Sequence, residues 1–150
     1  MADWLDVVAT PFLLAALGWI TVTDIRSHRI PDAVSLPLIG AGLALASMRS
    51  GGLPSDHLIG AAAAYLVFAA FGEAFYRLRG REGLGLGDAK LLAAAGAWLG
   101  WADLPLLVVM AAGGALLFGM VRAWSAKHQL AFGPWLAMAF AVLWLRFLVT

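Results

Sequence analysis

The sequence predicts an all-α polytopic membrane protein, with six transmembrane helices in a single domain that covers residues 1–150. Two observations support this prediction. Of the 150 residues, 63% are hydrophobic and only 13% are charged, whereas a soluble domain carries about 25% charged residues. Long apolar segments alternate with short polar loops along the chain, which has a mean hydropathy of +0.88. No internal repeat or low-complexity linker divides the chain.

The first three expected helices occupy the N-terminal half. The first covers about residues 4–23 and ends where Asp24 opens a polar loop. Asp32 is placed to cap a second helix over about residues 33–48, because a carboxylate accepts hydrogen bonds from the free N–H groups of a first turn. A polar turn with two glycines and a proline leads to a third helix over about residues 58–76.

Three further helices follow. The fourth covers about residues 88–101, with Asp88 as its cap. The fifth covers about residues 105–120 and starts at a proline, which a helix tolerates in its first turn. The sixth covers about residues 130–148, with Pro134 near its beginning. Several of these are slightly shorter than the roughly 20 residues that span a bilayer, and the fourth is the weakest, so five spans remain open.

The basic residues predict the orientation of the chain. Most of them lie at the first, third and fifth loops, and only Arg49 and Arg146 lie at the other side. Cytoplasmic loops of membrane proteins carry an excess of Lys and Arg. We therefore expect the odd loops, together with Asp24 and Asp88, at the cytoplasmic face and both termini outside. The residues that carry this signal are Arg26, Arg29, Arg77, Arg79, Arg81, Lys90, Arg122 and Lys127.

Composition also excludes several kinds of site. The chain has no Cys, which excludes disulfides, thiolate zinc sites and thiol catalysis. Its three His are scattered and make no His-x-x-x-His pair, so we expect neither a metal nor another cofactor. The net charge of +1 and the lack of a dense basic cluster give no indication of nucleic-acid binding.

The stretch from Arg81 to Lys90 is the one place where charges and glycines gather. Its glycines free the backbone and allow another chain to approach closely. Asp88 follows them, and Asp24 ends a different apolar segment on the same predicted side. Two carboxylates within a few ångströms share a proton, so one acts as base and the other as acid when water attacks a peptide carbonyl. Spacing alone leaves open both this dyad and two helix-capping aspartates.

Two motifs resemble those of the type 4 prepilin peptidases. Asp24 to Asp32, with Pro31 before Asp32, is similar to their Asp-x6-Pro-Asp signature, and Gly85-Leu86-Gly87-Asp88-Ala89-Lys90 is similar to their Gly-x-Gly-Asp-x-Lys signature. The segments Arg81-Glu82-Gly83 and Phe132-Gly133-Pro134 also resemble that family. Presenilin-like proteases share Gly-x-Gly-Asp, but both signatures in order are specific. The resemblance covers nearly the whole chain as a catalytic domain.

The resemblance implies an aspartic endopeptidase in the bacterial inner membrane, with Asp24 and Asp88 as its catalytic pair at the cytoplasmic side. The implied partner is a type IV prepilin or pseudopilin-like precursor embedded in lipid, whose short basic leader is cut off after a Gly. Many relatives also methylate the new N-terminus and carry Cys-x-x-Cys zinc-binding pairs. Because this chain has no Cys and its loops are short, we do not expect methyl transfer. The substrate's identity and the oligomeric state stay open.

Other motif residues have alternative interpretations. Asp32 is interpreted as a helix cap rather than a catalyst. Lys90 either reaches the membrane interface or tunes the charge of Asp88, and Glu82 either orders its loop or meets the basic leader of a substrate. Pro134 starts or kinks the last helix, or shapes a substrate cleft. Gly85 and Gly87 would let an extended peptide reach the aspartates.

Two other functions remain as alternatives. A presenilin-like intramembrane protease would need its aspartates deeper in the membrane, which the polar residues after Asp24 disfavour. A non-enzymatic membrane subunit or small transporter would need polar residues at mid-membrane depth. The second, fourth and fifth apolar segments have almost none.

Overall fold

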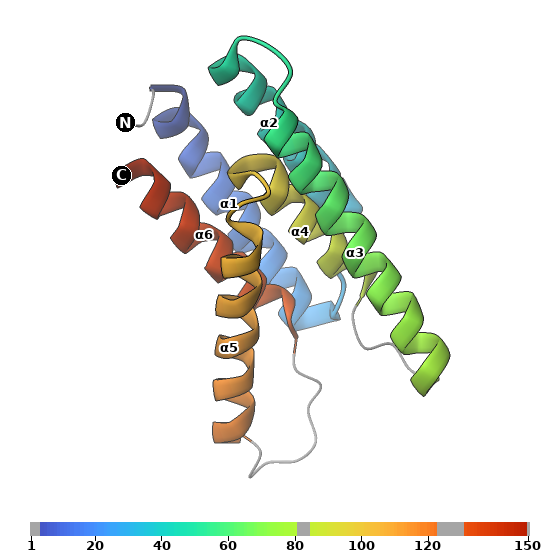
Figure 1. The fold of residues 1–150 in the computed structure, drawn as a ribbon. Helices are drawn as coiled ribbons and strands as arrows, with labels where there is room; N and C mark the ends of the chain where they lie inside the picture. Colours follow the sequence, from blue (N-terminus) through green and yellow to red (C-terminus); the bar gives the residue numbers. More distant parts are fainter. Residues whose placement is uncertain (1–3, 81–84, 123–130, 150) are drawn as a thin grey trace.

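The structure is a computed structural model that describes residues 4–80, 85–122 and 131–149, and within these ranges it is all-helical (Figure 1). The predicted order of six helices is confirmed. Four of them, α1, α2, α3 and α5, are long and apolar enough to cross a membrane. The helices are α1 (Trp4–Ser27), α2 (Asp32–Ser50), α3 (Ser55–Arg79), α4 (Leu86–Leu99), α5 (Leu104–Arg122) and α6 (Gly133–Val149).

Helix α4 forms the centre of the bundle, between α2, α3 and α6. With only 14 residues, it is shorter than its neighbours, yet every residue from Leu91 to Trp98 is buried. Glycines make this packing possible. A Cβ on Gly96 would collide with the backbone of Gly60 in α3, and a Cβ on Gly42 of α2 would collide with the ring of Trp98. The Trp98 indole also donates a hydrogen bond of 2.8 Å to the carbonyl of Leu38.

Several helix boundaries differ from those predicted. Helix α3 begins at Ser55 and ends at Arg79, which makes it longer at both ends than the apolar run alone indicated. Its end is set by Gly80, whose φ of 65° stops the helix while its N–H still donates to the carbonyl of Tyr76. Near this end of the helix, Glu73 and Arg77 lie one turn apart and form an ion pair at 2.7 Å.

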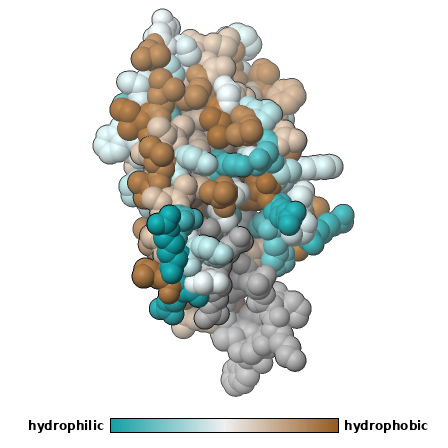
Figure 2. Space-filling model, turned by 90° about the vertical axis from the view of Figure 1, so that its right-hand side faces the viewer, coloured by the Kyte–Doolittle hydropathy of each residue, from teal (hydrophilic) through white to brown (hydrophobic). Residues whose placement is uncertain are grey.

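The helices alternate in direction, so the ends of α1, α3 and α5 and the starts of α2, α4 and α6 lie at one end of the bundle (Figure 1). Both termini lie toward the other end. Apolar side chains dominate the upper part of the face in Figure 2, and strongly hydrophilic ones gather mainly lower down. Many large apolar side chains, such as Phe12 and Val67, are more than half exposed, as a surface in contact with lipid requires.

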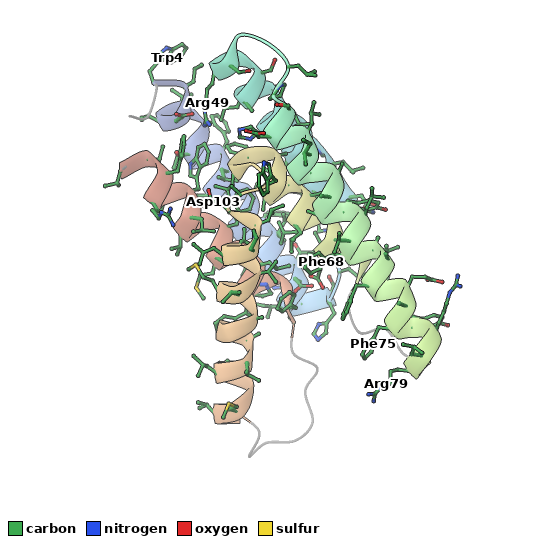
Figure 3. The ribbon with its side chains drawn as sticks, in the orientation of Figure 1. Trp4, Arg49, Phe68, Phe75, Arg79 and Asp103 are labelled. Carbon is green, nitrogen blue, oxygen red and sulfur yellow. The ribbon has the colours of Figure 1, made fainter. Side chains whose placement is uncertain are left out.

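A buried ion pair holds together the end of the bundle nearest the termini. Asp6 of α1 is 1% exposed and accepts a 2.6 Å hydrogen bond from Nε of Arg49 at the end of α2 (Figure 3). The guanidinium lies 5.2 Å from the ring centre of Trp144 and 5.0 Å from that of Phe147, both in α6. Three helices therefore meet at one arginine.

Candidate active site

Asp24 lies in the last turn of α1, one turn before the helix ends. The sequence analysis ended this helix at residue 23, but the polar residues continue it. The hydroxyl of Thr23 donates to the carbonyl of Trp19 at 2.8 Å, and that of Ser27 donates to the carbonyl of Thr23 at 2.7 Å. The helix thus projects Asp24 inward, where the residue is only 6% exposed.

The Asp24 carboxylate accepts a hydrogen bond from the backbone of α6, a helix far from α1 in the sequence. The N–H of Gly133, the first residue of α6, donates to Asp24 Oδ2 at 3.1 Å. A Cβ on Gly133 would lie 2.5 Å from that same oxygen, so only glycine fits this position. Sequence reasoning noticed Gly133 only as part of a motif and missed this contact, because a backbone N–H leaves no signature in the sequence.

Asp88 lies in the first turn of α4. It was predicted to cap this helix, but the cap position belongs to Gly85, whose carbonyl accepts the Asp88 N–H at 3.1 Å. Asp88 is therefore not the N-cap residue, although its carboxylate accepts a backbone hydrogen bond from Gly85 at the start of the helix. A Cβ on Gly87 would lie 2.9 Å from Cβ of Ile30. This glycine lets the start of α4 approach the segment that follows α1.

The two carboxyl groups influence each other electrostatically. Asp88 lies outside the four helices that are long enough to cross a membrane. Burial and then the negative charge of Asp24 raise the pKa of the Asp88 carboxyl to about 6, against an opposing backbone hydrogen bond from Gly85. A like charge raises a carboxyl pKa only when it is nearby. Asp24 and Asp88 therefore form a pair in which Asp88 holds a proton more readily than an ordinary aspartate.

Lys90 and Asp32 form a second contact between helices at this end of the bundle. Lys90 Nζ donates to Asp32 Oδ1 at 2.6 Å, which joins the start of α2 to α4. The interpretation of Asp32 as a helix cap is wrong: Pro31 occupies the cap position, and no side chain makes a capping hydrogen bond there. Pro31 takes the extended backbone that a cap needs, which leaves the Asp32 carboxylate free for Lys90.

The remaining predicted residues have different positions. Pro134 is the second residue of α6 and lines a groove between α6 and α1. Gly85 borders a cavity of about 390 Å³, which Phe68 and Glu73 of α3 also line; Phe68 is labelled on α3 in Figure 3. Glu82 lies outside the described residues. Among the residues that are described, no group of three or more His, Asp or Glu side chains could hold a metal ion.

The arrangement provides the parts of an acid–base site. Asp24 is a buried carboxylate that accepts a hydrogen bond from one N–H donor, and burial and the charge of Asp24 raise the pKa of the Asp88 carboxyl to about 6. Such a pair can accept a proton from water and donate one to a leaving amine. The cavity between α3 and the start of α4 is lined by Gly85 and Leu86, which directly precede Gly87 and Asp88 in the sequence.

Comparison with known proteins gives a consistent result. The Type IV leader peptidase family matches residues 11–121. The protein named prepilin leader peptidase/N-methyltransferase of Aeromonas salmonicida (strain A449) is 41% identical over 144 residues, which cover 91% of this chain and 49% of that protein. Its namesake in Dickeya chrysanthemi is 42% identical over 154 residues, with coverages of 87% and 54%.

A more distant relative, the prepilin leader peptidase/N-methyltransferase of Escherichia coli (strain K12), is 37% identical over 122 residues, with coverages of 79% and 54%. The chain thus spans about half the length of the curated relatives that it matches. No solved structure matches it significantly.

Proposed function

This chain belongs to the type IV leader peptidase family, and from that premise we propose that it is a membrane aspartic endopeptidase with Asp24 and Asp88 as its catalytic pair. The observation that carries the proposal is the pairing of two buried or half-buried carboxyls from the ends of α1 and α4, where the charge of Asp24 acts on Asp88. The proposed substrates are type IV prepilin or pseudopilin-like precursors, cut after a Gly that ends a basic leader.

In the proposed mechanism, one carboxylate takes a proton from water as the water attacks the scissile carbonyl. The other carboxyl, protonated at the start, donates to the nitrogen that leaves. Asp24 is suited to the role of base, because the Gly133 N–H stabilises its ionised form. Asp88 is suited to the role of acid, because its raised pKa keeps a proton available.

The location follows from the same proposal. The active site would lie at the cytoplasmic face of a bacterial inner membrane, where the basic residues of the odd loops are expected. A precursor would keep its apolar helix in lipid and its basic leader in the cytoplasm. Its scissile bond would then reach the level of the two aspartates. Family membership favours this reading over the presenilin-like and transporter alternatives.

We also propose that these 150 residues cleave without methylating the product. Several relatives carry N-methyltransferase in their names, but the chain matches only about half of their length. It also has no Cys for a thiolate zinc site. The peptidase signatures lie within the matched half, which supports assigning peptide cleavage to this polypeptide.

Substitution of the pair tests the mechanism. Asp24→Asn and Asp88→Asn should each lower cleavage of a co-expressed precursor at least about 100-fold, since each removes a general acid or base. Asp32→Asn is the matched control and should stay within about fivefold of wild type, because its ion pair with Lys90 is partly exposed. The readout is the leader-sized mobility shift of the precursor. Wild-type cleavage by either dyad variant would contradict the mechanism.

Cleavage of a precursor by the purified enzyme in the presence of S-adenosylmethionine tests the proposal that this polypeptide does not methylate its product. Mass spectrometry of the product should show a free N-terminal amine. A gain of one methylene mass on that amine would overturn the proposal and leave the peptidase assignment unaffected.

A further inference from the structure

An apolar groove of about 340 Å³ lies between α1 and α6. Leu17 and Ala137 are buried in its lining, while Gly18 and Met138 are exposed beside them. Both walls belong to apolar helices, and α1 is long enough to cross a membrane. The groove therefore opens to the lipid side of the bundle.

One end of the groove meets the candidate active site. Thr21 lies three residues before Asp24, and Pro134 directly follows Gly133, whose N–H holds the Asp24 carboxylate. A helix rises about 1.5 Å per residue, so the groove starts about 5 Å from Asp24 along α1, at Thr21, and extends to about 15 Å, at Leu14. The same two helices that fix Asp24 thus form the walls of a path from the lipid to it.

The chemistry of the lining selects an apolar occupant. Its one side-chain hydroxyl, on Thr21, already donates to the carbonyl of Leu17 at 2.8 Å. A polar or charged ligand would find few partners, and burying it without hydrogen bonds is costly. A Cβ on Gly18 would meet nothing within 4 Å, so the groove has free space there. Small residues at such a site let another helix approach closely in lipid.

We propose that this groove docks the apolar helix of the precursor, on the side of the scissile bond that remains in the membrane. The inference rests on the proposed function and adds to it a binding site outside the aspartate pair. A helix seated against Gly18 and Ala137 would present its cytoplasmic end, and the peptide bond next to it, at the level of Asp24.

Filling the groove tests the proposal. The probe is a designed precursor with a Lys-rich leader that ends in Gly, an apolar helix of about 20 residues and a soluble reporter. Gly18→Leu should raise KM for this probe about tenfold, equivalent to about 1.4 kcal/mol of binding free energy, with little change in kcat. Gly40→Leu is the matched control, because Gly40 is also an exposed helical glycine with nothing within 4 Å of an added Cβ. An unchanged KM in Gly18→Leu would overturn the proposal.

Crosslinking gives a readout that does not depend on cleavage or on the folding of Gly18→Leu. A photoreactive residue replaces Met138 in the groove, or Leu66 on α3 as the control, in an Asp88→Asn background; the two positions are 54% and 65% exposed. The probe should crosslink at 138 and not at 66. Equal crosslinking at both positions, or adducts at 138 only with lipid or with a second copy of the chain, would overturn docking. Crosslinking at 138 by a wild-type enzyme that never cuts the probe would support docking and contradict the proposed function.

Discussion

The geometry of this site depends on the lack of a Cβ atom at Gly133. Its N–H stabilises the ionised Asp24 carboxylate, and any side chain at this position would enter the space of that carboxylate. The residue also lies at the start of α6, so its hydrogen bond to Asp24 links the last helix to the first. The hydrogen bond to Asp24 and the close approach of α6 to α1 therefore both require glycine at position 133.

Gly133→Ala tests this dependence. The added methyl group should push the Asp24 carboxylate away and break the 3.1 Å hydrogen bond. Because a small displacement of a catalytic group strongly lowers the rate of the chemical step, we expect kcat to fall about 100-fold with a smaller change in KM. Gly113→Ala is the control, since an added Cβ there meets nothing within 4 Å. Wild-type kcat in Gly133→Ala would show that Asp24 does not need this position.

At this scale the sequence singled out Asp24 and Asp88 as a candidate pair but did not predict the contacts around them. The prediction of Asp24 and Asp88 rests on their motifs and on the membrane side expected for both. The partner of Asp32 did not follow, because the sequence favoured a cap at a helix start, whereas the cap position belongs to Pro31. Lys90 forms its ion pair with Asp32 and not with Asp88. The sequence could not predict this, because the partner of Lys90 depends on how the helices are placed relative to one another.

At the scale of elements, the short helix α4 determines the shape of the bundle. It carries Asp88 at one end and the close contact with α3 near the other. In lipid, helices associate through close packing and not through a hydrophobic drive. The contact between Gly60 and Gly96 is therefore one place where α3 and α4 pack backbone against backbone.

We expect Gly96→Ala to disrupt this packing. Its Cβ would collide with the backbone of Gly60, which cannot turn aside as a side chain can. Such overpacking costs about 1–3 kcal/mol. Gly40→Ala is the comparison and should be stabilising by about 0.5–1 kcal/mol, since its Cβ would meet open space and alanine favours helix. Thermal unfolding in detergent micelles measures both. A Gly96→Ala protein as stable as wild type would show that α3 and α4 have room to separate.

The helix count and order followed from apolar runs and their breaks, but the exact ends did not. Polar residues extend α1 beyond Asp24 because Ser27 hydrogen-bonds back to the preceding turn. Ser55 starts α3 earlier than the apolar run does. Hydropathy detects the part of a helix that faces lipid, and it misses polar turns that continue the same helix into water.

At the scale of the whole molecule, alternating helix directions bring the ends of α1 and the start of α4 to the same end of the bundle (Figure 1). Two aspartates that are 64 positions apart (88 − 24) in the chain thereby become neighbours. Because the described helices alternate in direction from α1 to α6, both termini lie toward the opposite end.

Reporter fusions test this topology in cells. Fusions after Ser27 and after Gly80 should report the cytoplasm, because both follow helices that end at the aspartate side. Fusions after Gly52 and at the C-terminal residue should report the outer side. A cytoplasmic C-terminus would contradict the arrangement, because α6 ends toward the end of the bundle opposite the aspartates.

The buried pair of Asp6 and Arg49 has a consequence for how the chain enters the membrane. On the proposed orientation, Arg49 has to be carried to the outer side. Moving one elementary charge across a potential of 100 mV involves about 2.3 kcal/mol of electrical work. If α1 and α2 insert together with Asp6 already bound to Arg49, the pair carries no net charge across the membrane. The electrical work of moving the Arg49 charge is then cancelled by that of Asp6. Arg49, one of the two arginines that oppose the orientation signal, would thus add no net charge to the translocated hairpin, and its guanidinium contacts α1 and α6 from the end of α2.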